Sequence, residues 1–183
     1  MSNTEKRGLQ ASVDGFAHEH IVAGILMKRY QNVSLVDLPL SPYDIIIVRK
    51  REKGRENIIR AQVKTATKSI SFIGGVRGGV DRTYKSGVKE YKQSTATSDV
   101  VIGLHPLNKD SFELYFVPTV LIEEMHQKSV SLNKIKDLKN NYFILENCKK
   151  KRSYLRNVKN IKLFSNSLIL LRLFIHLLLN LIT

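Results

Sequence analysis

The sequence contains one cysteine, Cys148, so no disulfide can form within a single chain. The first ten residues are polar and lack the apolar run that a secretory signal peptide requires. Both absences are typical of proteins in a reducing compartment, and we expect a cytoplasmic location. No internal repeat is evident.

Two further kinds of site are absent. The glycine-rich segment 74–79 lacks the Gly-x-x-x-x-Gly-Lys-Ser/Thr arrangement of a phosphate-binding loop. His105 and His126 do not have the spacing of metal ligands with each other. We therefore interpret the glycine segment as a loop and both histidines as structural or surface residues.

Acidic residues are scarce. Sixteen Asp and Glu against thirty Lys and Arg give a formal net charge of +14, and such a surface attracts a polyanion. Phosphate contacts position a duplex without specifying its sequence. The residues that we expect to make them are Arg49, Arg51, Lys53, Arg60, Lys68, Arg77 and Arg82. A surface charge that only keeps the protein soluble is the alternative, and charge does not distinguish DNA from RNA.

The one long apolar stretch, 167–182, is short for a membrane span, which needs about 20 predominantly apolar residues. Arg172, His176 and Asn180 interrupt it at intervals of four, which places them in one polar stripe on a helix. We expect an amphipathic helix packed against the core or a second subunit. Membrane contact through residues 167–183 is the less favoured alternative.

The length suits one domain with an appendage. Composition shifts near Asn147, where a basic run, Lys149–Arg152, precedes the apolar tail. The run either binds nucleic acid or is a solvated linker. We expect a domain over 1–146, followed by a basic segment and apolar helical tail over 147–183.

Two apolar runs, 42–48 and 57–64, flank a charged segment, 51–56, that contains a glycine. This pattern predicts two antiparallel strands joined by a turn. Because side chains alternate along a strand, Gln62 and Lys64 project to the same face. An amide and an ammonium group are thus placed together.

The register of the two strands decides which residue faces Asp44. Pairing centred on Lys53 places Asp44 opposite Gln62, and pairing centred on Gly54 places it opposite Lys64. A turn centred between Lys53 and Gly54 instead sets Asp44 against the other face of the strand, and the cluster then depends on a bulge or twist.

This cluster is suited to metal-assisted hydrolysis of a phosphodiester. A carboxylate and an amide oxygen are hard ligands of the kind that Mg²⁺ prefers. A bound metal lowers the pKa of water and stabilises charge on the reacting phosphate, while a lysine orients the water or neutralises the phosphate. We expect Asp44 to hold the metal and Lys64 to serve the water.

A third oxygen donor is suggested by a helix expected over 13–30, with Asp14 as its N-cap. Glu19 shares a face of this helix with Val22, Ala23, Leu26 and Tyr30. A buried carboxylate needs a partner, such as Lys64 or a metal. The alternative is a partly exposed glutamate at the helix margin.

Farther along the chain, the patterns predict a short helix over 88–95, strands over 99–104 and 112–118, and a helix over 120–128. A helix, several strands and another helix indicate an α/β fold with a mixed sheet.

The order of a helix glutamate, an aspartate at a strand start and Gln62-Val63-Lys64 resembles the PD-(D/E)XK nuclease superfamily over residues 15–64. The resemblance implies a restriction-endonuclease-like core, with a central mixed β-sheet flanked by helices and, here, a C-terminal helical tail. It assigns Glu19, Asp44 and Gln62 to the metal, Mg²⁺ with Mn²⁺ as a substitute, and makes Lys64 the catalytic lysine.

The chain departs from the motif twice. Tyr43 stands between Pro42 and Asp44, and Gln62 replaces the usual acidic residue, which removes one negative charge from the metal site. A Gln-x-Lys form is similar to that of group I intron homing-type nucleases, and the overall pattern also resembles Holliday-junction-resolvase-like nucleases.

We therefore expect a metal-dependent DNA endonuclease of restriction-like, homing-like or junction-resolving type. We expect it to act as a homodimer, because two symmetry-related sites cut both strands of a duplex. The alternatives are a non-catalytic nucleic-acid-binding protein that retains the nuclease fold and a membrane-associated basic protein anchored by its tail.

Overall fold

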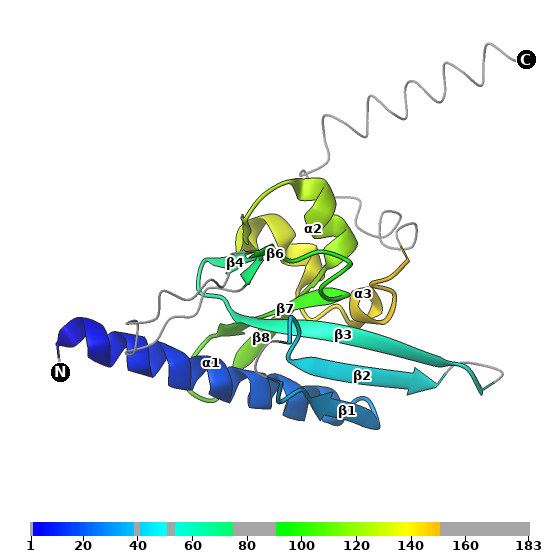
Figure 1. Cartoon of the computed structure of the whole chain (residues 1–183), viewed down its shortest axis with the longest axis horizontal. Coiled ribbons are helices and arrows are strands. Elements are labelled where there is room, and N and C mark those ends of the chain that lie inside the picture. The colour runs from blue at the N-terminus through cyan, green and yellow to red at the C-terminus, as the bar shows by residue number, and fades with distance from the viewer. Residues whose placement is uncertain (1, 39–40, 51–53, 75–90, 151–183) are drawn as a thin grey trace, which may run out of the picture.

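The computed structural model describes residues 2–38, 41–50, 54–74 and 91–150. Its elements are, in chain order, α1 (Asn3–Met27), β1 (Asn32–Leu35), β2 (Ile45–Lys50), β3 (Glu56–Thr65), β4 (Ser69–Ser71), β5 (Ile73–Gly74), β6 (Tyr91–Lys92), β7 (Val100–Pro106), β8 (Phe112–Pro118), α2 (Thr119–Met125), β9 (Ser129–Ser131), η2 (Leu132–Leu138) and α3 (Tyr142–Glu146). Figure 1 shows α1 along one side of a central sheet and α2 beyond its other side.

Five of the described strands form the central sheet, in the order β1-β2-β3-β7-β8. β3 and β7 run parallel, whereas the other neighbours run antiparallel, so the sheet is mixed. Short antiparallel pairs, β4 with β9 and β5 with β6, lie outside it. The predicted α/β class, with a central mixed sheet flanked by helices, is confirmed.

One face of the sheet is a continuous apolar surface. Ile59, Ala61 and Val63 alternate along β3 and are all buried. The pairing across β7 places Phe116 of β8 on the same face, and its ring centroid lies 5.0 Å from that of Tyr142 on α3. α3 therefore covers this face. Each large apolar side chain buried here contributes about 1.5–3 kcal/mol.

The opposite face carries Gln62 and Lys64. Lys64 pairs with Gly103 of β7, and a Cβ at Gly103 would overlap the Ile70 side chain of β4. The glycine thus lets β4 pack closely on this face. The candidate site lies on the face that these short strands partly cover.

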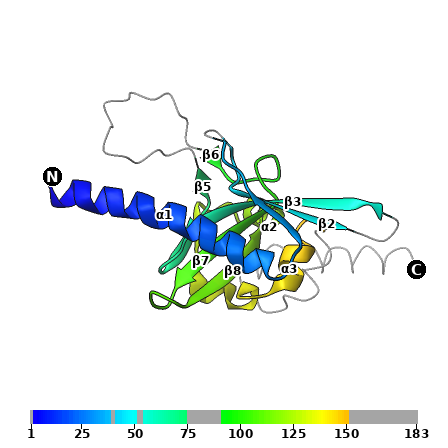
Figure 2. The same ribbon diagram turned by 90° about the horizontal axis from the view of Figure 1, so that it is seen from below.

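α1 begins ten residues before its predicted start, so the assignment of Asp14 as the N-cap is wrong. Ser2 is the N-cap and forms a capping box with Glu5. Asp14 instead accepts a hydrogen bond from Gln10 within the helix. The first part of α1 is exposed, so it has no apolar repeat from which a helix could be predicted. Figure 2 shows this part extending past the sheet.

The C-terminal part of α1 packs against the central sheet. Val22, Ala23 and Leu26 are buried where the helix lies against β1 and β3. The helix ends at Met27, so Tyr30, predicted as its last residue, follows it and reaches Glu146 of α3 with its hydroxyl group.

Three of the four elements predicted after residue 87 are of the predicted type. The strands predicted over 99–104 and 112–118 are β7 and β8, and the helix predicted over 120–128 is the shorter α2. The helix predicted over 88–95 is wrong in its described part, since Tyr91 and Lys92 form β6. Tyr91 lies so close to Gly74 of β5 that a Cβ on Gly74 would overlap the Tyr91 ring, so the absence of a side chain at Gly74 permits the β5–β6 pairing.

Within the described residues, no helix is both long and apolar enough to cross a membrane. The predicted tail helix lies in 151–183, outside the described residues. The division into 1–146 and 147–183 therefore stays a prediction. Cys148 is buried and unpaired.

Candidate active site

Asp44 lies immediately before β2 and directly opposite Gln62. Ile45 pairs with Ala61 across the antiparallel β2–β3 ladder, and the Asp44 backbone N–H donates to the Ala61 carbonyl over 2.9 Å. This is the register centred on Lys53, one of the three considered from the sequence. Of the three registers that the sequence left open, the ladder has the one that places Asp44 opposite Gln62.

Two donors hold one oxygen of the Asp44 carboxylate. Gln62 Nε2 lies 2.5 Å from Asp44 Oδ2, and the Val63 backbone N–H donates to the same oxygen over 2.7 Å. Burial raises the pKa of Asp44, while the Val63 N–H, the charge of Lys64 and the Gln62 amide oppose the rise. No described residue donates a hydrogen bond to Oδ1.

Glu19 on α1 brings a second carboxylate to this place. Burial and the neighbouring Asp44 charge raise the pKa of Glu19 to about 7, while His20 and Lys64 act in the opposite direction. Lys64 thus interacts electrostatically with both carboxylates. The structure brings together the four residues predicted from the sequence, with Glu19 from α1, Asp44 at β2, and Gln62 and Lys64 from β3.

The site has the donors for a hard divalent cation. Glu19 and Asp44 raise each other's energy in the ionised state, and Lys64 supplies one positive charge against their two negative charges. A cation beside both carboxylates would remove this repulsion. The described residues contain no group of three His, Cys, Asp or Glu side chains that could hold a metal. The candidate oxygen donors are the carboxylates of Glu19 and Asp44, and Gln62, the third ligand predicted from the sequence, donates its amide nitrogen to Asp44.

Gln93 follows β6 and was not predicted. It is fully buried, and its Nε2 donates to the Pro42 carbonyl over 3.2 Å and to Gln62 Oε1 over 3.4 Å. Its Oε1 accepts hydrogen bonds from Thr97 and Ser98. Nothing in the polar stretch around Gln93 distinguishes it, because the contact with Gln62 depends on tertiary packing.

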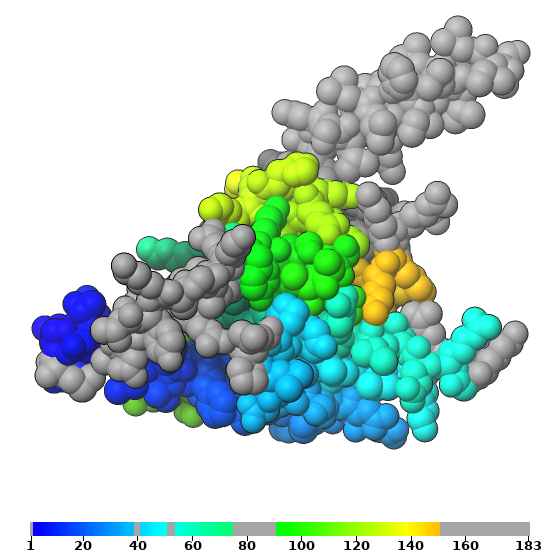
Figure 3. All heavy atoms as spheres, in the orientation of Figure 1, coloured from blue at the N-terminus to red at the C-terminus, as the bar shows by residue number. Residues whose placement is uncertain are grey.

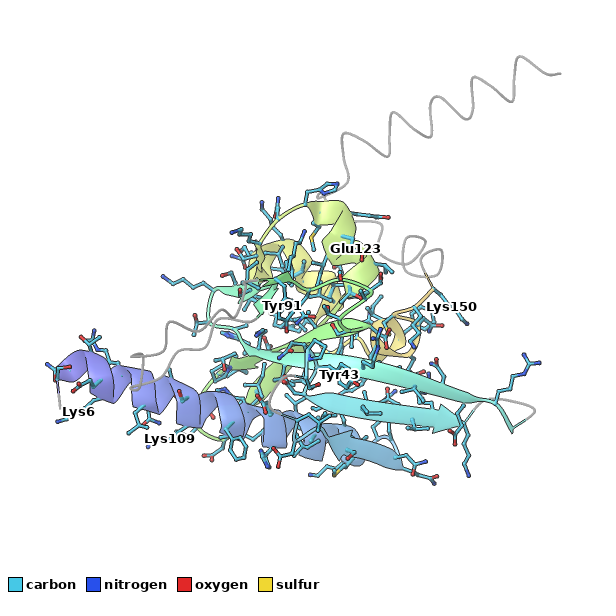
Figure 4. The ribbon with its side chains drawn as sticks, viewed as in Figure 1. Lys6, Tyr43, Tyr91, Lys109, Glu123 and Lys150 are labelled. Carbon is cyan, nitrogen blue, oxygen red and sulfur yellow. The ribbon has the colours of Figure 1, made fainter. Side chains whose placement is uncertain are left out.

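Tyr91 also belongs to this neighbourhood and was also missed. Burial and the Asp44 charge raise the pKa of its phenol, and a hydrogen bond with Gln93 lowers it. Figure 4 shows Tyr43 near the start of β2 and Tyr91 in β6, and the space-filling view shows the segment after β6 against the start of β2 (Figure 3). The Tyr91 phenol therefore lies within electrostatic range of the Asp44 carboxylate.

Two of the predicted phosphate-binding arginines are engaged within the protein. Arg60 pairs with Asp99 over 3.1 Å and donates to the carbonyls of Thr95 and Ala96. Arg49 pairs with Glu146 over 3.0 Å. The side chain of Lys68 is exposed. The remaining four, Arg51, Lys53, Arg77 and Arg82, lie outside the described residues.

No protein-family model matches the sequence, and no curated protein matches it. A solved structure, that of the bacterial homing endonuclease I-Ssp6803I, matches with a TM-score of 0.52 and 11% identity. The match covers 78% of this chain and 98% of the other. The fold is similar to that of a homing endonuclease. At this identity the likeness concerns the fold alone, and it agrees with the nuclease fold expected from the sequence.

Proposed function

We propose that this chain is a metal-dependent DNA endonuclease that hydrolyses phosphodiester bonds. The observation that carries the proposal is the meeting of Glu19, Asp44 and Lys64 beside Gln62, at the junction of α1, β2 and β3. Two carboxylates that repel each other, with an ammonium group nearby, are typical of the active site of a metal-assisted phosphodiesterase. The similar fold of a homing endonuclease supports DNA as the substrate.

Asp44 and Glu19 would hold Mg²⁺, with Mn²⁺ as a substitute. The ion supplies Lewis-acid activation of the phosphodiester and a more acidic water when it is bound. The Val63 N–H and Gln62 amide hold Asp44 Oδ2, which leaves Oδ1 available for the ion. Lys64 orients the attacking water or neutralises phosphate charge.

A net charge of +14 supports a polyanionic partner. Because one such site cuts one strand, we further propose that the protein acts on a duplex as a homodimer. Restriction-like, homing-like and junction-resolving substrates all present the same phosphodiester to the site.

The test compares cleavage of plasmid and branched DNA in Mg²⁺, in Mn²⁺ and in EDTA, for the wild type, Asp44→Asn and Lys64→Met. Metal-dependent cutting should fall by about 10²-fold or more in each variant. Asp137→Asn and Lys134→Met are matched controls on η2, which packs against β8, at the far edge of the sheet from β1. These controls should cut as the wild type does.

One outcome identifies the competing function. Salt-sensitive DNA binding by the wild type without cutting under any metal condition would replace the proposal with a non-catalytic nucleic-acid-binding protein. The amide at Gln62, where the motif usually has an acidic residue, is the feature that favours this second candidate.

A further inference from the structure

The orientation of the Gln93 amide is determined by its partners. The Pro42 carbonyl oxygen only accepts hydrogen bonds, so the atom of Gln93 that faces it at 3.2 Å is the nitrogen. The other end of the amide faces the hydroxyl groups of Thr97 at 2.7 Å and Ser98 at 2.9 Å, and both donate to its oxygen. Gln93 is fully buried, so no water competes for these bonds.

The orientation of the Gln93 amide in turn determines that of the Gln62 amide. Gln93 Nε2 also faces the Gln62 amide, so the Gln62 atom nearest to it is the oxygen, at 3.4 Å. The Gln62 nitrogen is then the atom directed at Asp44 Oδ2. Turning the Gln62 amide by half a rotation would set two NH₂ groups against each other and an oxygen against the carboxylate. Gln62 is 8% exposed, which leaves it little contact with solvent.

We propose that Gln93 is a positioning residue that orients the Gln62 amide, so that Gln62 acts as a hydrogen-bond donor to Asp44 and not as an oxygen ligand of the metal. The consequence for catalysis rests on the proposed nuclease function, whereas the orientation itself does not. In this arrangement the Gln62 amide, which replaces the motif's acidic residue, donates a hydrogen bond to the Asp44 carboxylate.

The donor role explains how a neutral residue works at this position. A third carboxylate beside Asp44 and Glu19 would add repulsion in a buried place, whereas the NH₂ group stabilises the ionised form of Asp44. The Val63 N–H acts on the same oxygen, so two donors direct the carboxylate in one orientation. Hydrogen-bonded partners behind a ligand of this kind typically change metal affinity or activity by about 10–100-fold when removed.

The direct test uses protein free of metal and DNA. Proton exchange of the Gln62 side-chain NH₂ is followed by ¹H–¹⁵N spectroscopy, with the signal assigned by its loss in Gln62→Met. In the wild type this NH₂ should exchange more slowly than that of the exposed Gln127. In Gln93→Met, which removes the anchor and keeps the volume, exchange should quicken about fivefold, as expected for one lost hydrogen bond.

Thr119→Val is the matched control. Thr119 is fully buried, and its hydroxyl donates to the Ser98 carbonyl, so its loss perturbs the same loop without touching Gln93 or Gln62. Exchange of the Gln62 NH₂ should be unchanged in this variant. An equal increase in Thr119→Val and Gln93→Met would indicate general loosening and would overturn the proposal.

A second variant covers failure of Gln93→Met to fold. Gln93→Glu keeps an acceptor for Thr97 and Ser98 but lacks the NH₂ group that faces Gln62, so it should release the Gln62 amide in the same way. Unprotected Gln62 NH₂ protons in the wild type would overturn the proposal without any variant.

Cleavage and metal binding then separate this proposal from the proposed function. If the wild type cuts DNA, Gln93→Met should lower kcat by about tenfold and leave the KM for DNA unchanged. Calorimetry with Mg²⁺ alone should show weaker binding to Gln93→Met than to Thr119→Val. A wild type that cuts nothing would end the nuclease proposal, while the exchange result would still decide the orientation of Gln62.

Discussion

Gln62 Nε2 lies 2.5 Å from Asp44 Oδ2, across the start of the β2–β3 ladder. Through this contact a neutral amide stabilises a buried carboxylate whose pKa is already raised by burial. The balance between the carboxylates, their donors and a cation leads to three predictions, and the basic side chains lead to a fourth.

Metal binding should stabilise the wild type and not Asp44→Asn. A ligand that binds only the folded protein at about 100 times its Kd adds about 2.7 kcal/mol, which raises Tm by several degrees. Thermal unfolding in Mg²⁺ and in EDTA measures this shift. In EDTA, Asp44→Asn should be at least as stable as the wild type, since it removes a buried charge while its oxygen still accepts from Gln62 and Val63. An equal Mg²⁺ shift in both proteins would place the ion elsewhere.

Glu19 should make stability depend on pH. Its pKa is raised to about 7 in the folded protein, so between its ordinary value and about 7 the folded state binds more protons than the unfolded state. The contribution of Glu19 to the free energy of unfolding is therefore fully present at acid pH and is lost as pH rises through about 7. Urea unfolding without metal across this range, compared with Glu19→Gln, measures the effect.

The Glu19→Gln protein should show a flatter dependence on pH over that interval. Cleavage should rise in the same range for the wild type, because a cation binds the ionised carboxylate. A wild-type stability profile identical to that of Glu19→Gln would contradict the half-buried, Asp44-coupled position of Glu19.

Gln62→Glu should make folding depend on metal. The new carboxylate would face Asp44 where the amide now donates, and two carboxylates sharing a site repel each other. We expect a loss of about 1–3 kcal/mol in EDTA near neutral pH, with recovery on adding Mg²⁺ or on acidification. Gln62→Met, which removes the amide without adding charge, is the control. Equal stability of Gln62→Glu with and without Mg²⁺ would show that this position does not sense the ion.

Removing the charge of Arg60 and removing that of Lys68 should have different effects on stability and on the salt dependence of DNA binding. Arg60 is tied to Asp99, of which 8% is exposed, so Arg60→Met should cost about 1–3 kcal/mol of stability and leave the salt dependence of DNA binding unchanged. Lys68 is exposed, so Lys68→Met should leave stability unchanged and reduce the salt slope by about one. Chemical unfolding and salt titration of DNA binding provide both readouts. A reduced salt slope for Arg60→Met would return Arg60 to the DNA-contacting set.

The local parts of the site were predictable because they depend on one strand at a time. Alternation with a period of two places Gln62 and Lys64 on one face whatever the rest of the chain does. The turn chemistry narrowed the position of Asp44 to three registers, and the ladder selected the one in which it meets Gln62. The start of α1 was not predictable, because a solvent-exposed helical segment has no apolar side on which periodicity can be read.

Sequence therefore carried the chemical identities of Glu19, Asp44, Gln62 and Lys64 and the side of each element on which they lie. Tertiary structure decided that α1 crosses the sheet where Glu19 reaches Asp44, and that Gln93 is buried behind Gln62. The physical reason is the distance along the chain between the groups that interact. Strand alternation is a property of neighbouring peptide units, whereas the meeting of groups 25, 31 or 45 positions apart follows from how the whole apolar core packs.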